Sequence, residues 1–193
     1  FMIPNIVQGG NVIITTIISA YVIAIVSILI AHGWRKRTFI SIACICAILT
    51  GIMLIAGLTT WLTALSGIAD ELAFYLAKDN QWLDMRGLII SGIIIASLGV
   101  LDDVVTTQVA TVEELHKSNP ALSRRELFRA ASSVGSEHIT SLVNTLALAY
   151  VGASLPFIIM LTMRQTNSPL ITVNGEYIAT EVVRTLVASI GLV

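Results

Sequence analysis

The stretch from Gly87 to Leu115, GLIISGIIIASLGVLDDVVTTQVATVEEL, decides the class of this protein. It is apolar over most of a length that exceeds the roughly 20 residues a helix needs to cross a bilayer. Two adjacent carboxylates, Asp102 and Asp103, interrupt it. A charged side chain inside a membrane is kept where it has a partner, a water path or a proton. The stretch therefore predicts a membrane-spanning helix that carries a functional acid pair.

The composition of the whole chain agrees with a membrane protein. Of its 193 residues 55% are hydrophobic and only 12% are charged, whereas soluble domains carry about 25% charged residues. We expect an all-α bundle of about five spans, forming a single transmembrane domain over residues 1–193. The expected spans are Val12–Ala31, Thr38–Leu58, Gly87–Leu115, Ile139–Met163 and Tyr177–Val193. Both ends look like cuts in a longer protein, in which an extracytoplasmic domain could precede Phe1.

The distribution of lysine and arginine predicts the orientation of the spans. Loops 32–37 and 116–137 hold seven basic residues, and loops 59–86 and 164–176 hold three. Cytoplasmic loops of membrane proteins carry the excess of basic residues. We therefore expect loops 32–37 and 116–137 in the cytoplasm and loops 59–86 and 164–176 outside, in a multi-pass protein of the cell membrane.

Two connecting segments have patterns of amphipathic helices at the membrane surface. On the inner side, Ser123 and Glu126 have the spacing of a capping box. The face that follows them is apolar: Leu127, Ala131 and Val134. On the outer side, the segment 59–77 also has apolar residues at helical spacing: Trp61, Leu65, Ile68 and Leu72. These patterns predict one interfacial helix on each side of the membrane.

The acid pair is the main candidate site. Two carboxylates this close resist being ionised together, so one of them can take up and release a proton. We therefore predict that Asp102 and Asp103 form a proton relay. Glu181 and Arg184, three residues apart, share a helix face. Arg184 stays charged and is the expected electrostatic partner of the acid pair or of Glu181; alternatively, Glu181 and Arg184 only neutralise each other.

Other polar or small residues in the spans are expected at contacts between helices. Small side chains let helices approach closely, and hydroxyl or amide groups form hydrogen bonds across the contact. The predicted helix-interface residues are Gly99, Thr106, Thr107, Ser141, Asn144 and Thr145.

Several functions lack support in the sequence. It contains no phosphate-binding loop, no metal-spaced cluster of Cys and His, and no G-x-S-x-G turn. No nucleophile and base are visible as a pair, so we do not expect an enzyme, a cofactor or a metal. No basic-aromatic pattern indicates nucleic acid, and the expected partner is the lipid bilayer.

Three blocks of the sequence resemble the YibE/F-like family of bacterial multi-span membrane proteins. They are LGVLDDVVTTQVATVEEL (98–115), SRRELFRAASSVGSEHITSLVNTLALAYVGASLP (123–156) and EYIATEVVRTLVASIGLV (176–193). This resemblance covers most of residues 87–193 and implies a membrane protein without a known chemistry.

The order of features is also similar to one half of the membrane domain of the RND exporters and their SecD/SecF relatives. A basic turn with an aromatic residue, HGWRKR (32–37), precedes the second span, and GVLDD (99–103) matches a segment whose acids are the proton site in that family. The resemblance implies a proton-coupled transporter component, or alternatively an accessory of protein translocation. It also implies a second half, from another copy or a paralogous subunit. A membrane scaffold without transport is the third hypothesis.

Overall fold

The computed structural model describes residues 1–69, 71–163 and 174–192. Within these ranges the chain forms helices and no strand, which confirms the all-α class. The helices are α1 (Met2–Val7), α2 (Val12–His32), α3 (Lys36–Leu62), α4 (Glu71–Asp79), α5 (Met85–Ser118), α6 (Arg124–Ala153), α7 (Leu155–Met163) and α9 (Glu176–Ile190).

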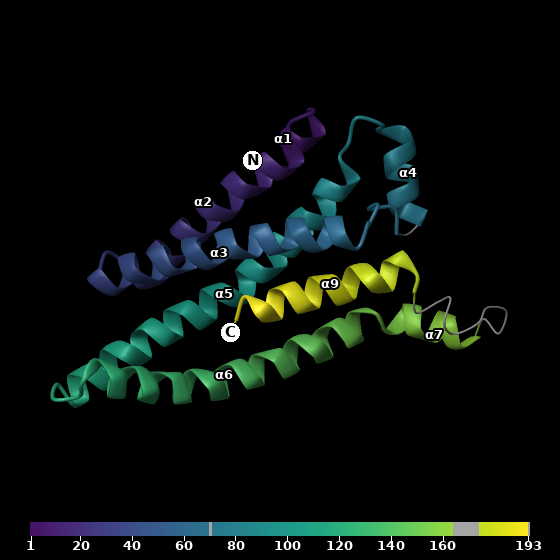
Figure 1. Cartoon of the computed structure of the whole chain (residues 1–193). Helices are drawn as coiled ribbons and strands as arrows, with labels where there is room; N and C mark the ends of the chain where they lie inside the picture. The colour runs from purple at the N-terminus through teal and green to yellow at the C-terminus, as the bar shows by residue number, and fades with distance from the viewer. Residues whose placement is uncertain (70, 164–173, 193) are drawn as a thin grey trace.

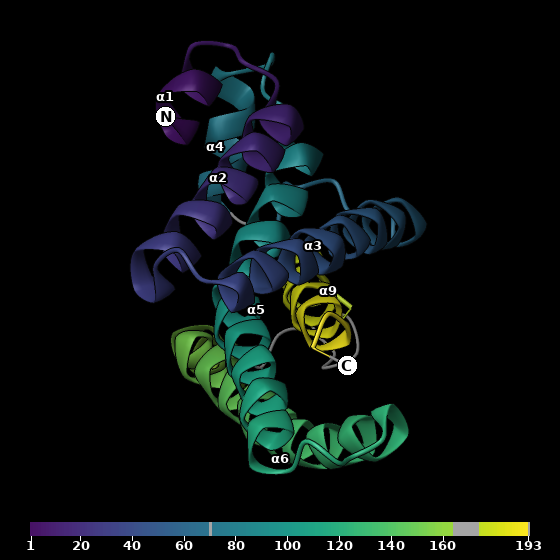
Figure 2. The ribbon, with the colours of Figure 1, turned by 90° about the vertical axis from the view of Figure 1, so that its left-hand side faces the viewer.

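Three of these helices, α2, α3 and α5, form the centre of the molecule. Among the described residues they are the helices long and apolar enough to cross a membrane, which confirms a membrane protein. Their facing side chains form one buried cluster, in which Ile28, Leu49 and Ile93 have no exposed surface. Figures 1 and 2 show α5 between the α2–α3 hairpin on one side and α6 on the other. The first three predicted spans therefore correspond to long apolar helices, each within a few residues of its expected ends.

Local sequence explains where α2 and α5 begin and how they meet. The side chains of Asn11 and Asp84 accept hydrogen bonds from the first turns of α2 and α5, at 3.0 and 2.9 Å. Between the two helices, Thr16 is hydrogen-bonded to Ser91 at 2.7 Å. The fully buried Ala20 follows one turn later in α2, and such small residues permit the close approach.

The predicted inner interfacial helix and the predicted fourth span are one helix, α6, so the expectation of a separate surface helix is wrong. The capping box is present, since Ser123 accepts from the Glu126 amide and the Glu126 carboxylate accepts from the Ser123 amide. No proline follows until Pro156, where the ring removes a backbone donor. The helix packs along α5, where the Gln108 side chain donates to the Ala131 carbonyl at 2.9 Å.

The predicted outer helix over residues 59–77 is also wrong. Helix α3 continues to Leu62, residues 63–69 are not helical, and α4 begins at Glu71. Gly67 has φ +86°, a conformation outside the helical region that favours glycine. The amides of Ser66 and Gly67 donate to the Glu176 carboxylate, so a contact distant in sequence replaces the bonds of a helix there.

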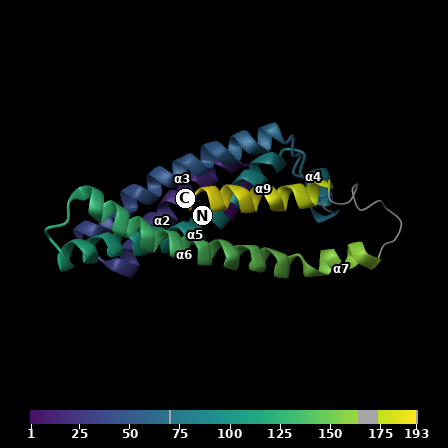
Figure 3. The ribbon, with the colours of Figure 1, turned by 60° about the horizontal axis from the view of Figure 1, so that its bottom comes forward.

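The fourth and fifth predicted spans correspond to α6 with α7 and to α9. Helix α9 has 15 residues, fewer than the roughly 20 that a span needs, and it lies between α3 and α6 (Figure 3). Its buried Val187 belongs to the central cluster. Most of the predicted loop 164–176 and the final residue of the fifth span lie outside the described residues. A total of five spans stays a prediction.

Candidate functional site

Asp102 lies near the middle of α5, at the contact between two membrane-spanning helices. The Ser27 hydroxyl of α2 donates a hydrogen bond to Asp102 Oδ2 at 2.8 Å. The other carboxylate oxygen, Oδ1, is buried and has no hydrogen-bond partner among the described residues. The carboxylate is therefore only partly satisfied in this arrangement.

The surroundings of Asp102 are apolar. Its neighbours on α5, Leu101 and Val105, are buried in the central cluster. The Asp102 side chain thus lies beside the apolar cluster with one carboxylate oxygen hydrogen-bonded to α2 and the other without a partner among the described residues.

Asp103 has different surroundings, although it is the next residue. Successive residues on a helix differ by about 100° in direction, and Asp103 is exposed on the outside of α5. Gly99 and Thr107, one turn away on either side, are exposed as well. The Thr106 hydroxyl donates to the Asp102 carbonyl of its own helix at 2.7 Å. Within the chain the acid pair is thus divided between a helix contact and an open face.

The polar residues predicted for span four also lie on an open face. Ser141, Asn144 and Thr145 of α6 are all exposed. The Thr145 hydroxyl donates to the Ser141 carbonyl at 2.9 Å, a bond inside one helix. Within the described part of the chain, these three residues form no hydrogen bond to another helix.

The second predicted pair, Glu181 and Arg184, is an ion pair on α9. Arg184 Nη1 donates to Glu181 Oε1 at 2.7 Å, and both side chains are about three-quarters buried. The guanidinium also lies near α5, because a Cβ atom built on Gly92 would be 3.6 Å from Arg184 Nη2. Gly92 precedes Asp102 by ten residues, or about 15 Å along the helix. Of the two partners that the sequence offered for Arg184, the structure shows Glu181.

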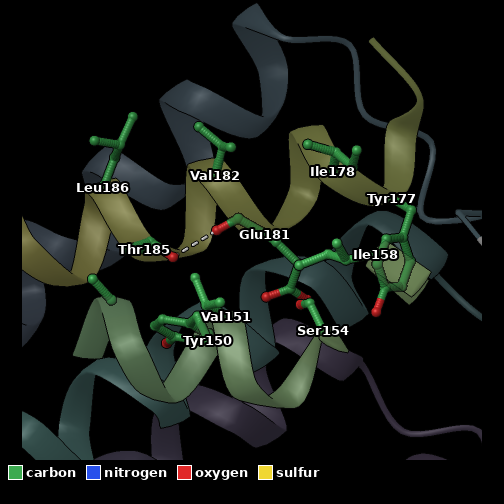
Figure 4. A pocket seen from close by; sticks show the side chains of 11 residues that line it. Tyr150, Val151, Ser154, Ile158, Tyr177, Ile178, Glu181, Val182, Thr185 and Leu186 are labelled. Atoms are coloured by element: carbon green, nitrogen blue, oxygen red, sulfur yellow. Dashed lines mark hydrogen bonds between the residues drawn. The ribbon is translucent and has the colours of Figure 1, made fainter. Parts of the chain in front are cut away.

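A cavity separates α9 from α6 and α7 beside this ion pair. Its volume is about 380 Å³, and its lining is mostly apolar. Figure 4 shows the Glu181 side chain extending from α9 toward Ser154 on the facing side. A second cavity of about 280 Å³ lies among α4, α5 and α9 and is lined by Glu181, Arg184 and Thr180. The buried Thr180 hydroxyl has no hydrogen-bond partner among the described residues.

The sequence interpretation missed two residues of functional interest. Ser27 had a detectable signal, since it continues a helical stripe of small residues: Thr16, Ala20, Ala24 and Ser27. Glu176 had none, because the loop that it binds lies about 110 residues earlier in the chain. In the described ranges no group of three or more His, Cys, Asp or Glu side chains is arranged to hold a metal ion.

The fold and the site define a helical membrane protein with an acid pair in its central spanning helix. The model of the YibE/F-like protein family matches residues 1–193, and the chain belongs to that family. No curated protein and no solved structure matches the chain.

Proposed function

We propose that this protein is a component of a membrane transporter in which protonation of Asp102 and Asp103 is coupled to movement of the helices. One observation carries the proposal: Asp102 lies between two spanning helices with one oxygen bonded to Ser27 and the other buried without a partner among the described residues. Acids inside a membrane are functional by default, because keeping them there is costly.

The coupling follows from the two protonation states of Asp102. The neutral carboxyl group is compatible with the packed contact between α2 and α5 and keeps the hydrogen bond from Ser27. The ionised group has an oxygen without a donor in apolar surroundings. Ionisation therefore favours an arrangement in which α2 and α5 separate enough to admit water. A proton that stabilises one of two helix arrangements is the element that a transporter needs.

Asp103 supports the proposal of a partner subunit. An acid facing lipid costs several kcal/mol on any scale, about 3 kcal/mol by membrane-insertion measurements. Gly99, Asp103 and Thr107 form an exposed stripe on α5 with a carboxylate at its centre. We infer that a second copy or a paralogous subunit covers this stripe and supplies the second half of an RND-like arrangement.

The proposed membrane is the cell membrane, with loops 32–37 and 116–137 in the cytoplasm. The turn from α2 to α3 and the turn from α5 to α6 lie at the same end of the molecule (Figure 1), and this end carries most of the basic residues. The positive-inside rule then supports the cytoplasmic side for both turns.

Infrared difference spectroscopy of the reconstituted protein tests the proton site. Lowering the pH should produce a protonated-carboxyl band, part of which disappears in Asp102→Asn and another part in Asp103→Asn. Ser27→Ala removes one hydrogen bond to Asp102 and should shift only the band assigned to that residue. Ser97→Ala is the matched control, since the Ser97 hydroxyl donates to the Ile93 carbonyl of its own helix.

The opposite outcome is equally clear. If both carboxylates stay ionised over the whole pH scan, or if the band changes equally in Ser27→Ala and Ser97→Ala, proton coupling at this site is wrong. A membrane scaffold with a permanent charge would then be the better hypothesis.

A further inference from the structure

A third cavity lies at the end of the molecule that carries the α2–α3 and α5–α6 turns. Its volume is about 640 Å³. It is formed by the start of α3, the end of α5 and the start of α6 together with the turn that precedes it. Cavities of this size accommodate small amphipathic ligands.

The walls of this cavity have two chemical characters. The apolar part of the lining, called the floor below, consists of Ile40, Val109, Val112, Leu122 and Leu127. The basic part, called the rim below, consists of Lys36, Arg37 and Arg124, and His116 also lines the cavity. Such a combination favours a ligand with an anionic head and an apolar body.

Among the described residues, the cations of the rim are only weakly paired, and Arg37 lies at long range from the Glu113 Oε2 atom, which itself has no hydrogen-bond partner. The acid in the lining, Glu113, is bound by Lys117 at 2.7 Å. Arg37 Nη1 is 3.8 Å from Glu113, beyond hydrogen-bond distance, and Arg37 Nε is buried with no hydrogen-bond partner among the described residues. Lys36 and Arg124 form no ion pair in the described ranges. The rim therefore carries cationic donors that remain available to an anion.

The position of the cavity along the helices indicates the level of the membrane at which it lies. Lys36 is the first residue of α3, and Ile40 lies one turn further into the apolar part of that helix. On α5 the apolar Val112 is followed by Glu113 and His116. The cavity thus lies where spanning helices change from apolar to charged residues, the level of the lipid head groups.

We propose that this cavity binds an anionic phospholipid. Its phosphate would lie among Lys36, Arg37 and Arg124, and its glycerol and upper acyl chain along Ile40 and Val112. Basic pockets between spanning helices bind anionic head groups in this way. The rim repels the choline cation of a zwitterionic lipid, so binding should depend on the net charge of the head group.

Native mass spectrometry of the purified protein tests this proposal with dioleoylphosphatidylglycerol and dioleoylphosphatidylcholine as probes. The wild type should retain phosphatidylglycerol in preference to phosphatidylcholine. Lys36→Gln with Arg124→Gln should weaken its binding by about fivefold for each cation removed. Arg35→Gln with Arg125→Gln is the matched control, because it removes the same charge from neighbouring residues that do not line the cavity. This control should bind as the wild type does.

Two further comparisons distinguish a specific lipid site from nonspecific attraction and from loss of folding. Lys36→Arg keeps the cation in place and should retain phosphatidylglycerol, whereas a variant that failed to fold would lose it. Equal weakening in the two double variants would overturn the proposal, since attraction to general surface charge would then suffice. Displacement of the lipid by an equal concentration of glycerol 3-phosphate would also overturn it, because the apolar floor would then contribute nothing.

Discussion

Helices α5 and α6 are similar in length but differ in how much of their surface is buried. Helix α5 has 34 residues, nine of them buried, and contacts α2, α3, α6 and α9. Helix α6 has 30 residues, of which Ala131 and Gly135 are buried. Both buried residues of α6 lie in its first half, where a Cβ atom on Gly135 would meet Gln108 of α5. The described residues therefore form a packed unit, α2–α3–α5, joined by α9 through Val187, and α6 contacts it through its two buried residues and through side chains that are only partly buried: Ile139, Val143 and Leu146.

The largest expected effect comes from a cavity made inside the packed unit. Leu49 of α3 is fully buried, and Leu49→Ala should lower the free energy of unfolding by about 2–5 kcal/mol. Leu148 of α6 is 73% exposed, and Leu148→Ala should change the free energy of unfolding by less than about 0.5 kcal/mol. Unfolding in mixed micelles measures both. A similar loss of unfolding free energy in the two variants would contradict this difference between the helices, since α6 would then be buried as deeply as α3.

The next effect concerns the attachment of α9 to the packed unit. The Glu176 carboxylate accepts from the amides of Ser66 and Gly67 and from the Ser66 hydroxyl, at 2.5–2.7 Å. Glu176→Ala leaves these partly buried donors without their acceptor, which costs at most about 1–3 kcal/mol for each group. We expect faster amide exchange at residues 66–67 and in the first turn of α9. Glu71→Ala, which removes an exposed carboxylate from α4, should leave these amides unchanged.

A smaller effect is expected for the open face of α5. A side chain at Gly99 would meet nothing within 4 Å, so Gly99→Leu should leave the single chain folded. If a second subunit covers the stripe with Asp103, the larger residue prevents close approach and shifts the protein toward monomers. Light scattering in detergent measures the assembly. Gly152→Leu, equally open but on α6, is the control, and an unchanged mass for both variants would argue against a partner on the Gly99 face.

The smallest effect concerns the start of α6. Hydrogen bonds from the Ser123 hydroxyl, and then from its amide, hold the pKa of Glu126 below its ordinary 4.5. Because the folded pKa is lowered, the cap stabilises the helix above the unfolded pKa, and this contribution is lost as the pH falls through the folded pKa. Amide protection in residues 124–128 should therefore decrease between about pH 6 and about pH 3. Ser123→Ala should have low protection at both values, and a wild type without this pH dependence would contradict the prediction.

The two wrong predictions, at Ser123–Val134 and at residues 59–77, have different physical causes. At the first, the capping box correctly predicted where a helix begins, but amphipathic spacing could not show whether that helix ends before the next apolar run. The less exposed face of α6 begins with Leu127, Ala131 and Gly135, while Val134 is exposed. At residues 59–77 the apolar spacing was compatible with a helix. The non-helical conformation of residues 63–69 depends on the contact with Glu176, about 110 residues later in the sequence.

The sequence by itself determined the membrane class, the three long apolar helices and the presence of the acid pair, because length, hydropathy and caps act within a few turns of chain. It also indicated the Glu181–Arg184 pair, since residues three apart share a helix face. Only the tertiary structure decided that Asp102 faces Ser27 while Asp103 faces outward. It also brought the basic residues of two separate turns around one cavity. The physical reason is that the rotation of each helix about its axis is fixed by packing against its neighbours, which no local pattern encodes.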